Sequence, residues 1–164
     1  ASSVSMSGAA SDTSTAQPGA AADPSLPGAC TLLTSDEIAA ILGAPQTANP
    51  ETADARSGIA SCTWGSLVNG HGLVAVTVAR PQASGVNIAD ILVTGSGGTA
   101  DAETVPLGDD GKLLKRGVMP GGGGTGRTVY VHTRGLTVLV AGLGERVNAP
   151  ALTSAARSAL AKLP

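Results

Sequence analysis

The sequence is short of the residues from which many protein cores and most catalytic sites are built. Its 164 residues include no Phe, one Trp, one Tyr, two Met, two His and two Cys. Hydrophobic residues still make up 42% of the chain, so the core has to consist of Val, Leu, Ile and Ala. Because each small aliphatic side chain buries little area, at roughly 25 cal/mol per Å², a covalent cross-link would add usefully to the stability of such a core.

Long apolar runs are missing as well. No stretch of 18 apolar residues occurs, so the sequence predicts no membrane-spanning helix. The chain begins at Ala1 without Met and enters a segment rich in Ala, Ser, Gly, Pro and Thr, in which Asp12 and Asp23 are the only charges. We expect residues 1–29 to be a disordered tether of a mature or trimmed protein. A lipid-modified cysteine just upstream of Ala1 would fit such a tether.

Charge is low in total, at −2, but it is unevenly distributed. Residues 1–111 hold eleven Asp or Glu and two Arg (−9), whereas residues 112–164 hold eight Lys or Arg and one Glu (+7). The simpler interpretation is that the two halves interleave in the fold and neutralise each other. The alternative is a positive partner-contact patch, attracting an acidic protein face, a teichoic-type polymer or lipid headgroups, and formed by Lys115, Arg116, Arg127 and Arg134.

Motifs for nucleotide binding and catalysis are incomplete. The segment Gly121–Thr128 comes close to the phosphate-binding pattern G-x-x-x-x-G-K-[ST], but Arg127 replaces the lysine and a strand-like segment follows where the motif needs a helix. No G-x-S-x-G nucleophile motif is present. His71 and His132 are far apart in the sequence, and neither has a neighbouring acidic residue that would orient it. We therefore predict no catalytic residue and expect that the protein is not an enzyme.

Metal, cofactor and nucleic-acid binding are also disfavoured. Zinc needs three or four ligands, and the two cysteines are better explained by a disulfide. Calcium could use the acidic residues of the 101–110 region, but their spacing is not that of an EF-hand, and a solvated turn is the simpler interpretation of Asp101, Glu103, Asp109 and Asp110. The acidic balance and the lack of interleaved aromatic and basic residues argue against nucleic acid as a partner. We predict no metal and no cofactor.

The cysteines Cys30 and Cys62 are the most informative residues of the chain. They allow only one intramolecular pairing, and a disulfide implies an oxidising, extracytoplasmic compartment. Closing this loop would stabilise the fold by about 3–4 kcal/mol by the chain-entropy argument. The alternative is a pair of buried free thiols in a cytosolic protein. Trp64, next to this cysteine, is expected to fill the core rather than to stack on a sugar or base.

The first helix has the clearest local signals. Thr34 and Glu37 have the spacing of a capping box, and Leu33 and Ile38 that of a hydrophobic staple. Gly43 supplies the C-terminal stop, so a helix is expected over Ser35–Leu42. Its apolar residues should face the core.

The remaining elements are predicted from alternating apolar residues between turn signals. In order they are a polar loop over 44–57, strands Ile59–Gly65 and Leu73–Arg80 joined across Asn69-Gly70, a helix over 86–93, an edge strand over 102–106, a turn over 108–111, a strand Leu113–Arg116, a flexible loop over 120–124, hairpin strands Thr128–Thr133 and Leu136–Gly142, and an amphipathic helix from Asn148 to Leu163. Without regular βαβ alternation, this order predicts an α+β domain over residues 30–164: a single antiparallel sheet, helices packed on one face, and one disulfide.

Several of these segments resemble a known family. The stretch Gly28–Glu37 with its Cys-x-Leu-Leu-Thr, the pair Leu42-Gly43, and Cys62-Thr63-Trp64 are similar to the pattern of DUF3558-type actinobacterial lipoproteins. The segment Val105–Asp109, the second hairpin and the terminal Ala-rich helix resemble its second half, so the likeness covers about Cys30–Leu163. It implies an exported, lipid-anchored cell-envelope protein from a high-GC bacterium, and the family pattern defines no catalytic residue. Positions that are commonly aromatic in the second half are mostly aliphatic here.

Together these features favour a non-enzymatic envelope protein, on the outer face of the cell membrane or secreted. It would bind a partner protein in an accessory or regulatory role such as envelope-stress signalling. One alternative is a carrier of a small apolar or lipidic ligand, which needs a cavity. The least favoured alternative, a hydrolase, needs a pocket in which His132 or His71 meets a carboxylate.

Overall fold

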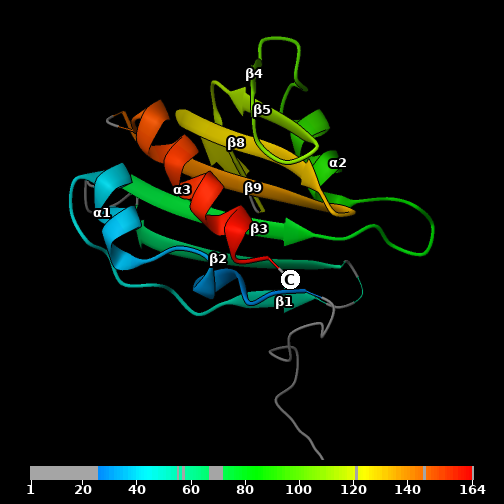
Figure 1. Ribbon diagram of the computed structural model, residues 1–164, viewed down its shortest axis with the longest axis horizontal. Coiled ribbons are helices and arrows are strands. Elements are labelled where there is room, and N and C mark those ends of the chain that lie inside the picture. Colours follow the sequence, from blue (N-terminus) through cyan, green and yellow to red (C-terminus); the bar gives the residue numbers. More distant parts are fainter. Residues whose placement is uncertain are drawn as a thin grey trace, which may run out of the picture.

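A seven-stranded antiparallel sheet organises the protein in its computed structural model, which describes residues 26–54, 56, 58–66, 72–120, 122–145 and 147–163 (Figure 1). The strand order is β1-β2-β3-β9-β8-β5-β4, and β6 and β7 form a separate two-stranded sheet. The elements are η1 (Ala29–Thr31), α1 (Ser35–Leu42), β1 (Thr52–Asp54), β2 (Ile59–Ser66), β3 (Gly72–Ala79), α2 (Ile88–Gly95), β4 (Glu103–Val105), β5 (Asp110–Leu114), β6 (Gly117–Met119), β7 (Gly122–Gly124), β8 (Gly126–Thr133), β9 (Leu136–Leu143) and α3 (Ala149–Ala161). The predicted α+β class and antiparallel sheet are confirmed.

Helix α1 forms as its local signals predict. The Thr34 side chain accepts a hydrogen bond from the Glu37 backbone N–H at 3.2 Å, and the Thr34 N–H donates to the Glu37 carboxylate at 2.7 Å. Gly43 ends the helix in the left-handed region, at φ 81°. The apolar stripe of the helix, which includes Ile38 and Ile41, is buried against the sheet.

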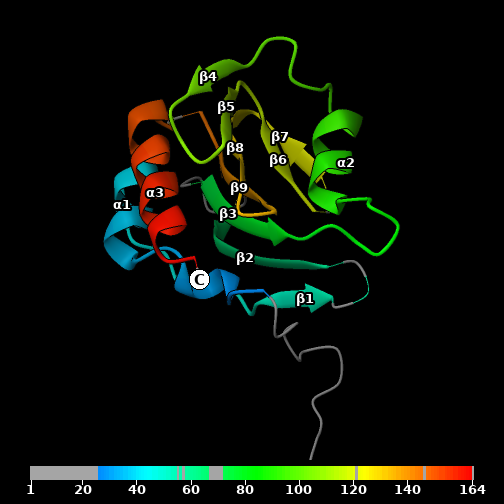
Figure 2. The same cartoon turned by 45° about the vertical axis from the view of Figure 1, so that its right-hand side comes forward.

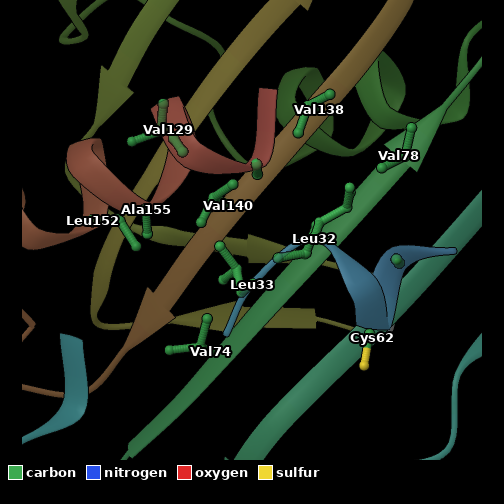
Figure 3. Packing of buried hydrophobic residues seen from close by; sticks show 14 of the residues in the cluster. Leu32, Leu33, Cys62, Val74, Val78, Val129, Val138, Val140, Leu152 and Ala155 are labelled. Atoms are coloured by element: carbon green, nitrogen blue, oxygen red, sulfur yellow. The ribbon is translucent and has the colours of Figure 1, made fainter. Parts of the chain in front are cut away.

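The main core lies between the sheet and the α1–α3 side. Valines of β3, β8 and β9 pack there with η1, α1 and α3, as Figure 3 shows for Leu32, Val74, Val129, Val140 and Leu152. These side chains are at most 1% exposed. Aliphatic side chains thus fill this core almost alone, as the absence of Phe requires.

The three helices divide between the two faces of the sheet, which corrects the prediction that all of them pack on one face. Helix α2 lies on the side opposite α1 and α3 (Figure 2), and its Ala89 and Val93 form a second cluster with Ala79, Tyr130 and Leu139. Strand side chains alternate between faces, so a strand that is apolar at every position needs cover on both sides. Strand β3 comes close to this, since Thr77 is its one polar side chain and its burial pattern is nearly continuous.

Three predicted loop or turn segments contain strands. Strand β1 lies in the expected loop 44–57, β5 begins at Asp110 inside the expected turn, and β6 pairs with β7 where a flexible loop was expected. Glycines suggested a turn in the second segment and a loop in the third, whereas in this fold glycine also permits close packing. The segment that contains β1 has no glycine. A Cβ at Gly111 would lie 2.8 Å from the Leu107 carbonyl oxygen, and one at Gly117 would lie 2.5 Å from the Leu143 side chain.

The predicted disulfide is present and joins η1 to β2. Cys30 and Cys62 are bonded, with their Cα atoms 5.0 Å apart. Trp64 lies on the same face of β2, is 4% exposed and belongs to the main core, so its predicted packing role is confirmed. No helix in the described part of the chain is long and apolar enough to cross a membrane. The predictions for most of the tether, for the Asn69-Gly70 turn and for His71 concern residues outside the described ranges.

Candidate functional site

The imidazole of His132 lies between two carboxylates. His132 is on β8, and its Nε2 is 2.9 Å from Oδ1 of Asp90 on α2. Its Nδ1 is 3.6 Å from Oδ2 of Asp110, the residue that pairs with it on β5. The side chains of all three are partly exposed. This arrangement was missed in the sequence, where His132 has no acidic neighbour, because Asp90 is 42 residues away along the chain.

Asp90 anchors this cluster through one of its two carboxylate oxygens. Besides His132, the Tyr130 hydroxyl donates to Asp90 Oδ1 at 2.7 Å and the Thr137 hydroxyl does so at 3.3 Å. Partial burial acts to raise the pKa of Asp90, but these hydrogen bonds and the charge of His132 outweigh it and hold the pKa below its ordinary value. Asp90 is therefore ionised at neutral pH, and no described residue donates a hydrogen bond to its Oδ2.

Tyr130 is held as a neutral hydrogen-bond donor. Its side chain is largely buried, and its ring meets the His132 ring edge-on with centroids 4.8 Å apart. Burial is the largest cause of its raised pKa, followed by the hydrogen bond to Asp90 and the negative charges of Asp90 and Asp110. The hydroxyl keeps its proton well above the pH at which a free tyrosine ionises, so its donation to Asp90 is maintained.

Local structure fixes the position of Asp90 on α2. Asn87 is the N-cap of the helix: its Oδ1 accepts from the Ala89 N–H at 2.9 Å, and its Nδ2 donates to the Ala79 carbonyl at 3.3 Å. The first contact begins the helix, and the second ties it to the end of β3. Since Ala89 is fully buried, the next residue, Asp90, is directed toward the β8–β9 hairpin.

A cleft of about 190 Å³ opens beside this cluster, and we refer to it as the acidic cleft. It lies between the start of α2 and the β8–β9 turn, and its charged or titratable lining residues are Asp90, Asp109 and His132. The turn itself is tight, because Arg134 and Gly135 both have positive φ, at 52° and 77°. The Asp109 N–H donates to the His132 carbonyl at 2.8 Å, which holds Asp109 at the edge of the cleft.

Among the described residues that line the acidic cleft, the hydroxyl groups are those of two threonines, Thr133 and Thr137. Neither serine nor cysteine is among the described residues that line it. Thr137 is 2% exposed, and its hydroxyl is directed at Asp90. The histidine–carboxylate contact that a hydrolase would need is present. His132 Nε2, the nitrogen that could act as a base, is 2.9 Å from the Asp90 carboxylate and 3.2 Å from the Tyr130 hydroxyl, which itself donates to Asp90. Within the described ranges, no group of three or more His, Cys, Asp or Glu is arranged to hold a metal ion.

The acidic residues that we considered for calcium do not all belong to this site. Asp109 lines the cleft and Asp110 faces His132, whereas Asp101 and Glu103 are exposed near and on the β4 edge strand. The near-match to a phosphate-binding loop is not followed by a helix, since Arg127 lies in β8. Neither motif gains a ligand-binding geometry from the fold.

Two of the four basic residues of the predicted partner-contact patch hold helix ends. Arg116 Nη2 donates to the Gly98 carbonyl at 2.6 Å and to the Val93 carbonyl at 3.3 Å, at the end of α2. Arg134 Nη1 donates to the Leu163 carbonyl at 3.0 Å, beyond α3. Arg127 lies at the opposite end of β8 from Arg134, and Lys115 is exposed just beyond β5. The fold therefore does not gather the four into one continuous patch.

One ion pair joins distant parts of the negative and positive halves of the chain, and a second joins residues two positions apart. Lys162 Nζ is 3.6 Å from the Glu37 carboxylate, and Lys112 Nζ is 3.8 Å from that of Asp110.

No family model, curated protein or solved structure matches the chain. The resemblance to DUF3558-type lipoproteins stays a prediction from the sequence.

Proposed function

We propose that this protein is an exported, lipid-anchored cell-envelope protein that binds a partner protein in an accessory or regulatory role and catalyses no reaction. One observation carries the proposal: both ring nitrogens of His132 face carboxylates beside an open cleft. A general base needs a nitrogen lone pair directed at the group that loses the proton. An imidazole held between Asp90 and Asp110 instead organises a charged surface for recognition.

Other features support the proposed location. The disulfide supports an oxidising compartment, because such bonds persist outside the cytosol. The Ala-, Ser-, Gly- and Pro-rich composition of residues 1–29 suits a tether between a domain and an anchor. The lipid anchor and the role in envelope-stress signalling rest on the family resemblance and on this tether.

Photo-crosslinking in the source cell tests the proposal. A photoreactive residue at Ile91, exposed on α2 next to Asp90, should give a discrete adduct with one envelope protein, in a fraction that contains the oxidised protein. The matched control places the same residue at Asp36, which is exposed on α1 on the other face of the sheet, and should not give that adduct.

Two outcomes would contradict the proposal. Recovery of the protein in the cytosol with both thiols reduced would exclude export. Lipid found bound to the purified protein by native mass spectrometry, without a protein adduct at Ile91, would favour the carrier of an apolar ligand. Both readouts use the full-length chain.

A further inference from the structure

We propose that the acidic cleft binds a lysine or arginine side chain of a partner protein, in a segment where aliphatic residues flank that basic residue. This inference rests on the proposed function and specifies the chemistry of its partner. It comes from three observations: a fixed carboxylate with a free oxygen, a second carboxylate at the edge of the cleft, and exposed apolar side chains beside it.

Asp90 is prepared to receive a cation. Its Oδ1 is saturated by three donors, from Tyr130, His132 and Thr137, while its Oδ2 has no donor among the described residues. The side chain is therefore fixed in position and charged before any ligand arrives. A preorganised carboxylate loses little side-chain entropy on binding, so a guanidinium or ammonium group gains most of the energy of the new hydrogen bond.

Asp109 supplies a second negative charge to the same cleft. Its backbone is fixed to His132 at 2.8 Å, and its exposed carboxylate has no hydrogen bond or ion pair with any described residue. Nearby cations are directed elsewhere: Lys112 pairs with Asp110, and Arg80, which precedes the cleft residue Pro81, extends along Gly58. His132 contacts Asp90 and Asp110, and Arg134, in the turn beside the cleft, donates to the Leu163 carbonyl. None of these four cationic or titratable side chains contacts the Asp109 carboxylate.

Two exposed apolar residues are sequence neighbours of residues that line the acidic cleft. Val86 and Ile91, at 40% and 52% exposure, are the large hydrophobic side chains that the described part of the chain leaves exposed. Val86 lies between the cleft residues Gly85 and Asn87, and Ile91 follows Asp90. Exposed apolar residues around a charged pocket are typical of an interaction site.

The combination selects one class of occupant. An acidic or purely apolar segment would remove water from two carboxylates without pairing them, at a substantial energetic cost. A volume of about 190 Å³ admits a guanidinium or ammonium group, since a water molecule in the liquid occupies about 30 Å³. Aliphatic neighbours of the basic residue would then cover Val86 and Ile91.

Titrating the full-length, oxidised protein with blocked tripeptides, followed by amide NMR shifts, tests this inference. Acetyl-Leu-Arg-Leu-amide should cause saturable shifts confined to residues 85–91, 109 and 132–137. Acetyl-Leu-Glu-Leu-amide should cause none of these shifts. Acetyl-Gly-Arg-Gly-amide should bind at least threefold more weakly, because it lacks the aliphatic contacts.

Variants locate the interaction within the cleft. Asp109→Asn should weaken binding of acetyl-Leu-Arg-Leu-amide about fivefold, as expected for a partly exposed charge pair. Asp36→Asn removes the same charge from the opposite face and should leave the affinity unchanged. The inference would be overturned if the acidic tripeptide bound equally well, if the shifts were centred elsewhere, or if Asp109→Asn had the affinity of the wild type. If an Ile91 adduct with an envelope protein still formed in cells, the proposed function would stand and only the chemistry assigned to the partner would be wrong.

Discussion

Asp90 connects three side chains of two neighbouring strands through a single oxygen atom. Tyr130 and His132 come from β8 and Thr137 from β9, so Asp90 ties α2 to the hairpin that forms one wall of the acidic cleft. Its partly exposed carboxylate explains both the position of α2 and the charge of the cleft.

Replacing Asp90 with Asn should lower the free energy of unfolding at pH 7 by about 1 kcal/mol, because charge-assisted hydrogen bonds are lost from a site that water partly screens. Urea denaturation against pH gives the sharper readout. The folded-state pKa of Asp90 is lowered, so its contribution is present above about pH 4 and is lost as pH falls through the folded value. The Asn variant should lose less stability than the wild type between pH 5 and pH 2. Parallel curves would show that the carboxylate has no such role.

Tyr130 can be titrated without interference, because it is the only tyrosine of the chain. Its pKa is raised, so the wild type should show little tyrosinate absorbance at pH 11, where a free tyrosine with a pKa near 10 is mostly ionised. Stability should be complete below pH 10 and decrease above it, since only the unfolded chain releases the proton there. In Asp90→Asn the absorbance should rise at lower pH. An ordinary titration curve in the folded wild type would refute the assigned hydrogen bond.

The sequence predicts residues of the core better than residues of the site. Cys30, Cys62 and Trp64 could be assigned because each is rare in this chain and has one obvious structural use. The contact of His132 with Asp90 spans 42 residues and depends on how α2 packs, so no local pattern indicates it. Asp110 reaches the other side of the His132 ring only because β5 pairs with β8 in the register that places Asp110 opposite His132.

At the scale of elements, helix α2 is held at both ends by side chains. Asn87 caps its start, and Arg116 donates to the carbonyls of Val93 and Gly98 at its end, with further contacts from Arg116 to the Ser96 hydroxyl. A guanidinium at the C-terminus also interacts favourably with the helix dipole. A helix of eight residues depends on such contacts, because it is too short to be stable alone.

Arg116→Met should therefore lower the free energy of unfolding by about 1–2 kcal/mol and reduce amide protection in α2. The matched control is Lys115→Met, which removes the same charge from the exposed neighbouring residue and should change stability by less than about 0.5 kcal/mol. Chemical denaturation and hydrogen exchange measure both effects. Equal effects of the two variants would mean that the charge, and not the helix-end contact, is important.

Elements with local signals were predicted to within a residue or two, whereas the side of the sheet on which they pack was not. The bounds of α1 follow from its capping box and Gly43, both of which act within a few residues. Helix α2 was predicted over 86–93, within two residues of its bounds, but its placement opposite α1 depends on which face of β3 still needs cover. Gly111 and Gly117 show the same limit of local prediction. Glycine is favoured both in turns and where another part of the chain packs closely, so the residue type alone does not distinguish the two.

At the scale of the whole molecule, the disulfide compensates for an aliphatic core without Phe. It closes a loop of 32 residues and lies with α1 and α3 in the main core. The double variant Cys30→Ala, Cys62→Ala should lose about 3 kcal/mol, with the melting temperature lowered accordingly. Reducing the wild type should reproduce this loss, while the amide spectrum around Asp90 and His132 stays native because the cleft lies on the other face of the sheet. A loss below about 1 kcal/mol would contradict this account of the core.

The elements that close the main core and the cleft proposed to bind the partner lie on opposite faces of the sheet. One face carries the disulfide, η1, α1 and α3, while α2 and the acidic cleft lie on the other (Figure 2). A partner docked at the cleft would therefore leave the covalently closed side unchanged. The basic residues of the alternative patch are divided between helix ends and the far end of β8.

Hydrogen exchange of the protein bound to its crosslink-identified partner shows which surface the partner covers. We expect new protection at residues 85–91 and 132–137, the two walls of the acidic cleft, and none on α1 or α3. Protection confined to α1 and α3, or centred on Lys115 and Arg127, would contradict this expectation and assign recognition to another surface.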